Sequence, residues 1–274
     1  MLFRRCGDAL PAFELNLFKN LLGFALLLPT IALVEGLQIP EFPWPEVGIA
    51  LVSGYLGIAV ADTWYLRALH LMGASRTGIV ASLLSPFVIL LSVLFLGESL
   101  RGWQLLGFAM VMSGILMVTW RSKRRSVDAE QVRKGVLYGA GAMFLMAVGI
   151  VMVKEILETR SFLWTTQIRL AGGIGGMLVY ILLRSKAAEV RRHYRQPLRW
   201  VTITFASFLA AYVSMMMWLA GYKLIPASEA SILNESANAW IVLLAWLMLG
   251  EQISARKLAG LGLTSAGVGI MLLV

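Results

Sequence analysis

The stretch LFLGES at residues 94–99 closes a long apolar run, and it returns as LMLGEQ at residues 247–252. The two copies begin 153 residues apart, and each places a glutamate directly after a glycine. Aligning the chain with itself at this offset brings further identical residues together, glycine and serine among them, so leucine abundance does not explain the match. We infer an internal duplication. We interpret each glutamate as a cap at the N-terminus of the next helix, where negative charge suits the helix dipole.

Composition places the chain in a membrane. Apolar residues make up 59% and charged residues 14% of the 274 positions, against about 25% charged in soluble domains. A bilayer accommodates such a chain as helices of about 20 apolar residues. The net charge of +9 is explained by basic loops beside anionic headgroups, so we expect no nucleic-acid partner. The single cysteine, Cys6, excludes an intrachain disulfide.

The predicted fold class is all-α, a polytopic membrane helical bundle of nine spans. In lipid each span must be helical, because its backbone groups have to pair internally. The connectors 120–134 and 184–200 are the long, basic ones. Gly172 and Gly176 form a small-xxx-small pair, which predicts close helix packing. The nine apolar segments are 12–34, 46–69, 75–96, 101–120, 135–157, 161–184, 200–222, 228–249 and 255–274.

Loop charge predicts the orientation of the chain. Most of the 24 lysines and arginines fall on alternate connectors that share one side of the membrane, and the positive-inside rule makes that side cytoplasmic. The N-terminus is then inside, the C-terminus is outside, and we expect a multi-pass protein of the inner, cytoplasmic membrane. His70 and His193 lie in the polar connectors, and we expect them to be solvated.

The duplication predicts two repeats of opposite orientation. Spans one to four recur as spans six to nine, and a shift of five helices reverses the direction of crossing, which is an inverted-topology repeat. The predicted domains are residues 1–120, the basic connecting loop 121–134, and residues 135–274. The fifth span, 135–157, has no counterpart in the first repeat. Either the protein has nine spans, or a first helix is missing upstream, and we favour the second explanation.

Two long segments carry a resemblance to a known family. They are ASLLSPFVILLSVLFLGESLRGWQLLGFAMVMSGILMV (81–118) and ASEASILNESANAWIVLLAWLMLGEQISARKLAGLGLTSAGVGIMLL (227–273). Each has a polar start, a long apolar stretch, Gly-Glu and a glycine-spaced helix, and so resembles the EamA-type permeases of the drug/metabolite transporter superfamily. The resemblance implies ten helices in two five-helix halves around a central solute path, with both termini cytoplasmic. The chain departs from it in lacking a first helix and in having Ala239 where the first copy has Pro86.

One face of the eighth span is the main candidate for solute binding. Its polar residues follow helical spacing, and a carboxylate inside a span costs about 3 kcal/mol facing lipid, so it should face a cavity or a partner. The alternative is hydrogen bonding between helices. Pro86 should also free a backbone carbonyl in the matching third span. The candidate residues are Ser231, Asn234, Glu235 and Asn238 in the eighth span, with Ser82 and Ser85 in the third.

Lys19 and Arg169 occupy matching places in the first and sixth spans. They are candidates for holding an anionic group of the solute or a mobile carboxylate, and the alternative is snorkelling toward headgroups. Tyr65 and Trp218 are candidates for lining the path, although aromatic residues also anchor spans at the interface. A further pair, Asp62 with Arg67, is suggested by its spacing of five residues.

These features favour a secondary active transporter, an exporter of small polar metabolites such as amino acids, working by alternating access. Matched cations and a carboxylate would suit a zwitterion, and protonation of Glu235 is a candidate for coupling to a proton gradient. The alternative is a translocator of lipids or lipid-linked sugars. The chain has no HExxH, P-loop or paired-aspartate motif, so we expect neither an enzyme nor a cofactor. The sequence also lacks the ring-forming filter motif that would indicate a channel. The expected partners are a small-molecule solute and membrane lipids, and the oligomeric state is left open.

Overall fold

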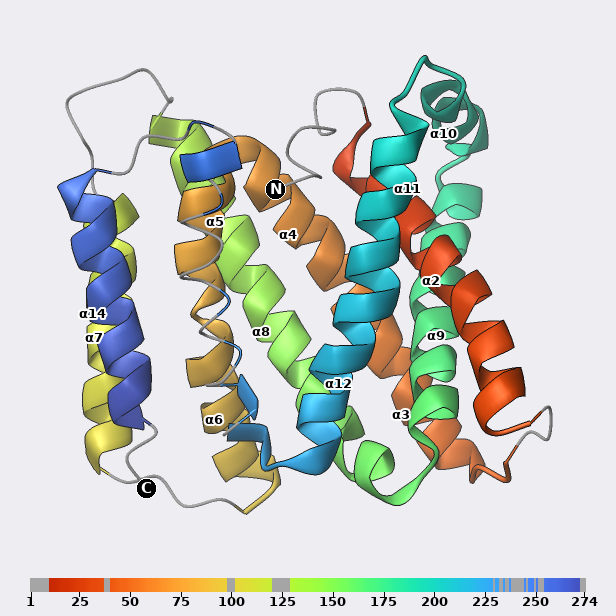
Figure 1. Ribbon diagram of the computed structural model, residues 1–274, viewed down its shortest axis with the longest axis horizontal. Helices are drawn as coiled ribbons and strands as arrows, with labels where there is room; N and C mark the ends of the chain where they lie inside the picture. The colour runs from red at the N-terminus through yellow and green to blue at the C-terminus, as the bar shows by residue number, and fades with distance from the viewer. Residues whose placement is uncertain are drawn as a thin grey trace. The chain divides into compact units, whose positions relative to one another are not determined.

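The computed structural model describes residues 10–36, 40–97, 102–119, 129–228 and 254–271, together with scattered positions between 230 and 250. Every regular element in these ranges is a helix (Figure 1). The α-helices are α2 (Ala12–Val34), α3 (Trp44–Gly54), α4 (Asp62–Met72), α5 (Ala74–Ala81), α6 (Leu84–Phe95), α7 (Gly102–Thr119), α8 (Ala129–Thr159), α9 (Phe162–Leu183), α10 (Ala187–Tyr194), α11 (Trp200–Phe208), α12 (Ser214–Leu224) and α14 (Ala255–Met271).

Six described helices are long and apolar enough to cross a bilayer, and they coincide with six of the nine predicted spans. The predicted spans at 101–120 and 255–274 form α7 and α14. Most of the predicted span at 228–249 lies outside the described residues, as do the glutamates at positions 98 and 251. The nine-span count and the inverted orientation therefore stay predictions. The six helices are Ala12–Val34, Trp44–Met72, Arg76–Phe95, Ala129–Thr159, Phe162–Leu183 and Trp200–Leu224.

The third span is interrupted between α5 and α6. A proline has no N–H to donate, and its ring crowds the carbonyl four residues earlier, which for Pro86 is Ser82. The helix departs from regular geometry at that point: the amides of Ser82 and Leu83 bond to carbonyls only three residues back, at 3.2 and 3.1 Å. Pro86 itself is buried in α6. The irregular turn lies directly before Pro86, and the carbonyl that Pro86 was expected to free stays a prediction.

Two spans contain a π-helical segment in their middle. One is η1 (Tyr55–Ala61), between α3 and α4, and the other is η2 (Leu209–Val213), between α11 and α12. A π turn inserts a residue into the helical ladder and is frequent at functional sites. Moving residues 56–60 along the chain by 153 positions reaches residues 209–213, so the repeat offset relates η2 to the middle of η1. This correspondence supports the duplication.

The contacts divide the chain into two compact units, each formed by two separate stretches of the sequence. Unit 1 contains Trp64–Ala147 and Pro226–Val274, and unit 2 contains Leu2–Thr63 and Val148–Ile225. Two of the boundaries fall inside α4 and α8, so these two helices contribute to both units, and the third follows α12 at Ile225. None of the three follows the predicted repeats, whose limits remain predictions from the sequence.

In unit 2, α3 and α9 cross at a row of glycines. A Cβ on Gly54 would overlap the carbonyl oxygen of Arg169, and a Cβ on Gly172 would overlap that of Leu51. A Cβ on Gly176 would likewise overlap a neighbour, in this case the ring of Tyr55. The two backbones touch here because no side chain intervenes, so the predicted role of the glycine pair in α9 is confirmed.

One end of unit 2 is fastened by two lysines that cap each other's helices. Lys154 of α8 is only 5% exposed and donates to the carbonyl oxygens of Tyr222 and Ile225, at 2.5 and 3.0 Å, where α12 ends. Lys223 of α12 donates to Leu157 and Arg160, at 3.0 and 3.1 Å, where α8 ends. Each ammonium thereby satisfies carbonyls that a helix terminus leaves unpaired.

In unit 1, α7 and α14 lie side by side, and Figure 1 shows the two helices running together. A Cβ on Gly114 of α7 would come within 2.7 Å of the carbonyl oxygen of Gly260 and of Thr264 Oγ1 in α14. Thr264 is buried and donates back to the Gly260 carbonyl. Glycine at position 114 therefore allows the close approach of the two helices.

Candidate functional site

Three charged side chains of unit 2 come together from α2, α4 and α9. Lys19 Nζ of α2 lies 2.5 Å from Asp62 Oδ2, and the two side chains are 12% and 20% exposed. Asp62 is the first residue of α4, directly after η1. The third charge is Arg169 in the middle of α9, which is 2% exposed and interacts electrostatically with Asp62. We call Lys19, Asp62 and Arg169 the buried charge cluster.

Arg169 is the least satisfied member of this cluster. Its Nε and Nη1 atoms are buried and have no hydrogen-bond partner in the part of the chain that the structure describes. Its Nη2 lies 3.6 Å from where a Cβ on Gly57 would be, so the guanidinium packs against η1. A buried charge is costly unless it is both paired and hydrogen-bonded. Two positive charges share one carboxylate here, which leaves the cluster with a net charge of +1.

Next to the cluster, α2 is tied to η1 by a chain of amides. Asn16 Nδ2 donates to the carbonyl oxygen of Ile58 at 2.7 Å and to Thr63 Oγ1 at 3.0 Å. Asn20 Nδ2 donates in turn to Asn16 Oδ1 at 2.8 Å. Asn16 and Asn20 are buried, at 0% and 1% exposed. The side chain of Asn16 thus supplies a donor to a backbone carbonyl of the π-helical segment.

Two amide oxygens in unit 2 remain without a donor among the described residues. They are Asn20 Oδ1 of α2 and Gln167 Oε1 of α9, both buried. The amide nitrogen of Gln167 donates to the carbonyl oxygen of Phe24 at 3.4 Å. Unsatisfied buried polar atoms are rare in native structures and call for a water, an ion or a ligand. The interior of unit 2 therefore offers donors on Arg169 and acceptors on Asn20 and Gln167.

In unit 1 the structure brings two predicted residues together. Ser85 Oγ donates to the carbonyl oxygen of Ser231 at 2.8 Å, and Ser231 Oγ donates to the carbonyl oxygen of Ser228 at 2.7 Å. The first of these bonds matches the alternative given above, hydrogen bonding between helices, and the second is local. Ser82 is buried, at 1% exposed. Glu235 and Asn238 lie outside the described residues, so their candidate roles stay predictions.

The other predicted solute-path residues that the structure describes differ in burial and in packing. Tyr65 and Asn234 in unit 1 are half-buried. Trp218 of unit 2 packs against a core cluster that includes Val153 and Leu219, and its ring lies 5.2 Å from that of Tyr222.

One predicted pairing and one predicted environment were wrong. Asp62 pairs with Lys19, whereas Arg67 lies 5.7 Å from the ring centroid of Tyr138. His193 is not simply solvated, because its Nδ1 lies 2.7 Å from Glu14 Oε1 and its side chain is 17% exposed. His70, placed in a connector, belongs to the last turn of α4. Pairings such as His193 with Glu14, 179 residues apart, leave no local pattern in the sequence.

Sequence reasoning also passed over Asn16, Asn20 and Gln167. A signal for the first two was present, because Asn16, Lys19 and Asn20 follow i, i+3, i+4 spacing on one face of an otherwise apolar span. Polar residues inside a span rarely face lipid, and this face packs toward η1.

Span-length apolar helices indicate a multi-pass membrane protein, and charges buried among such helices indicate a functional interior. The model of the EamA-like transporter family matches residues 1–120 and 133–273. The chain therefore belongs to the EamA-like transporter family, within the drug/metabolite transporter superfamily. Members of this family are transporters.

Solved structures agree on the fold. Twenty-eight chains of known structure are similar to this one. One of them, a crystal structure of a protein 19% identical in sequence, superposes with a TM-score of 0.70 and covers 99% of this chain and 91% of its own. At this identity the likeness concerns the fold alone. No curated protein matches the chain in sequence.

Proposed function

We propose that the protein is a secondary active exporter of small zwitterionic metabolites such as amino acids, and that Arg169 binds their carboxylate. The supporting observation is the pair of unpartnered nitrogens on this fully buried guanidinium. A carboxylate accepts two parallel hydrogen bonds from the fork of an arginine, and such pairs are stronger than neutral hydrogen bonds. The net charge of +1 on the buried charge cluster would then fall to zero when the solute binds.

The amide oxygens suit the other end of a zwitterion. Asn20 Oδ1 and Gln167 Oε1 are acceptors without donors among the described residues, and an ammonium group brings three donors. Lys19 has a different role in this proposal, because its partner is Asp62 rather than solute. An arriving carboxylate would compete with Asp62 for the charge of Arg169, so solute binding would leave Asp62 paired with Lys19 alone.

Transport would proceed by alternating access between the two predicted inverted repeats. The polar face of the eighth span, with Ser231, Asn234, Glu235 and Asn238, is proposed as a second part of the solute path. Protonation of Glu235 is proposed to couple transport to a proton gradient. The prediction for this residue is that Glu235→Gln changes both the rate of uptake and its dependence on pH.

The test is counterflow into liposomes containing the purified protein and preloaded with mixed zwitterionic amino acids. Uptake of the same amino acids in radiolabelled form should fall at least about thirtyfold in Arg169→Gln, because losing one partner of a buried charge pair costs at least about 2 kcal/mol. Arg133→Gln is the matched control, since Arg133 lies exposed near the start of α8. Size-exclusion profiles and melting temperatures would check that both variants fold.

The design separates the two functional hypotheses. Amines that lack a carboxylate should not compete for counterflow, because Arg169 gives them no binding energy. Wild-type rates in Arg169→Gln would overturn the role of this residue. Movement of fluorescent lipids across the bilayer, with no counterflow of any amino acid, would favour a lipid translocator instead.

A further inference from the structure

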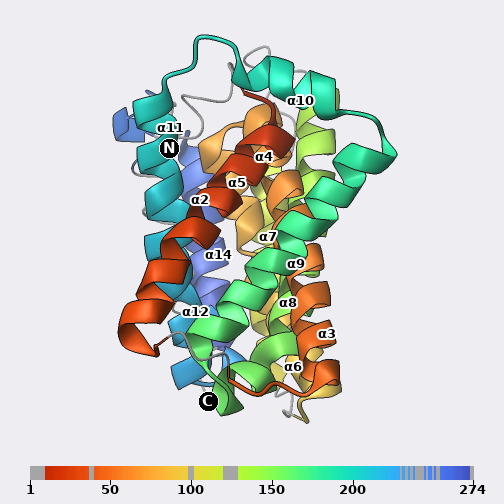
Figure 2. The ribbon, with the colours of Figure 1, turned by 90° about the vertical axis from the view of Figure 1, so that its right-hand side faces the viewer.

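The short helix α10 lies across the ends of its neighbours in unit 2. It follows the span-length helix α9 and precedes α11, which begins the span Trp200–Leu224, and Figure 2 shows it running crosswise to them and to α2. Its sequence, AAEVRRHY, has a strongly polar face and an inner face marked by Val190, which is 8% exposed. An amphipathic helix in this position lies in the plane of the membrane surface.

The inner face of α10 is fastened to the start of α2. Val190 packs in a cluster with Leu17 and Ile181. His193 Nδ1 lies 2.7 Å from Glu14 Oε1, and Tyr194 Oη donates to the carbonyl oxygen of Glu14 at 2.6 Å. Burial raises the pKa of Tyr194, so its hydroxyl keeps the proton that it donates. The orientation of α10 is therefore fixed by contacts on one side.

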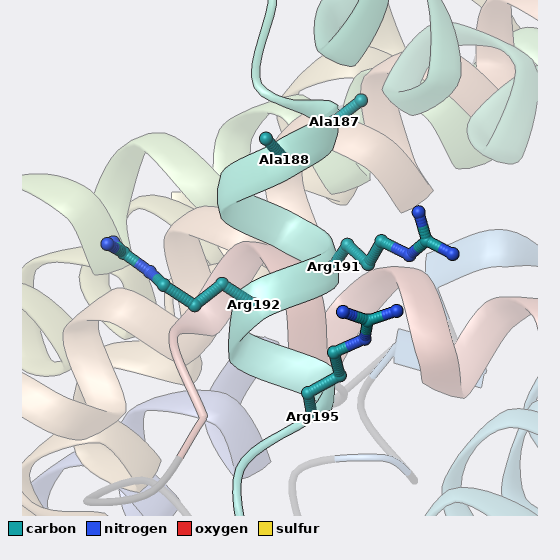
Figure 3. A pocket seen from close by; sticks show the side chains of 5 residues that line it. All are labelled: Ala187, Ala188, Arg191, Arg192 and Arg195. Carbon is teal, nitrogen blue, oxygen red and sulfur yellow. The ribbon is translucent and has the colours of Figure 1, made fainter.

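The opposite face carries three exposed arginines. Arg191, Arg192 and Arg195 line an open hollow of about 460 Å³ together with two exposed alanines at the start of the helix. Figure 3 shows Arg191 and Arg195 reaching out on one side of α10 and Arg192 on the other. No ion pair among the described residues involves any of the three. The one acid of the helix, Glu189, lies 3.3 Å from Lys186.

We propose that α10 binds the phosphate groups of anionic phospholipids through Arg191, Arg192 and Arg195. Guanidinium groups pair with phosphate oxygens in the same forked geometry that they use for carboxylates. Next to the arginines, the ends of α9 and α11 present exposed apolar side chains, with Leu182, Leu183 and Val201 at 74%, 80% and 86% exposed. Charged groups beside apolar span ends match a lipid, which joins a headgroup to acyl chains, better than they match free phosphate.

The experiment compares lipids added to the purified full-length protein in a neutral detergent. Phosphatidylglycerol should raise the melting temperature more than phosphatidylcholine, and native mass spectrometry should count more molecules of it bound. The triple variant R191Q/R192Q/R195Q should lose this preference, by about fivefold in affinity for each arginine that meets a headgroup. This measurement needs no transported solute, so its outcome is independent of the function proposed above.

A second triple variant serves as the control. R133Q/R184Q/R199Q removes the same amount of charge from exposed positions outside α10, and it should keep the preference for phosphatidylglycerol. Equal stabilisation by the two lipids would overturn the proposal, as would equal losses in both triple variants. Full stabilisation by inorganic phosphate alone would overturn it as well, because the site would then bind a free anion.

Discussion

Gly54→Ala tests how closely the buried charge cluster depends on the crossing of α3 and α9. A Cβ at this position would overlap the carbonyl oxygen of Arg169 and would lie 2.8 Å from its Cα, where an ordinary contact is 3.4–4 Å. The helices must therefore move apart by more than half an ångström. Overpacking of this kind lowers the free energy of unfolding by about 1–3 kcal/mol. Alanine favours the helix over glycine by about 1 kcal/mol, which offsets part of that loss.

The expected result is a net loss of up to about 2 kcal/mol in the free energy of unfolding, measured by denaturant titration in mixed micelles. Counterflow of amino acids should fall as well, because the backbone that moves is that of Arg169. Gly48→Ala and Gly175→Ala are matched controls on the same two helices, since a Cβ at either position meets nothing within 4 Å. Both should be neutral or slightly stabilising. A Gly54→Ala protein as stable and active as these controls would refute the inferred packing.

Three further substitutions test other contacts. Lys154→Met should lower the free energy of unfolding by about 3 kcal/mol, measured in the same titration, because two charge-assisted hydrogen bonds to the end of α12 are lost. Asn16→Leu should cost about 2 kcal/mol by leaving the carbonyl of Ile58 in η1 without its donor, and hydrogen exchange should increase locally in η1. Asp62→Asn should leave the charge of Lys19 uncompensated, so both the melting temperature and the rate of counterflow should fall. A melting temperature and a counterflow rate equal to those of the wild type would contradict the ion pair.

The helical fold was predictable because lipid imposes one rule on every span. An apolar run of sufficient length has to be helical, so the first span, predicted at 12–34, appears as Ala12–Val34. The irregular turn before Pro86 has a cause of the same local kind, since a proline has no N–H to donate. The helix α10 was not predicted, because eight residues in a charged connector carry too little apolar pattern to be told from a loop.

The candidate site was only partly predictable. Lys19 and Arg169 could be singled out because a charge inside a span is rare. Their partners could not be assigned, because Asp62 is 43 residues from Lys19 and its placement depends on how α2 packs against η1. The π-helical segments likewise have no signature in composition, although the offset that relates them was already visible in the repeated glycine and glutamate.

The crossed lysines at the ends of α8 and α12 restrict where unit 2 can bend. Separating these ends would break four charge-assisted hydrogen bonds together, at a combined cost of about 6 kcal/mol or more. At equilibrium that cost keeps the separated ends at less than about one molecule in ten thousand, so this end of unit 2 stays closed almost all of the time. Helix movements within unit 2 during transport must then leave the joined ends of α8 and α12 in place. The largest displacements are expected at the far end of α9, where α10 lies.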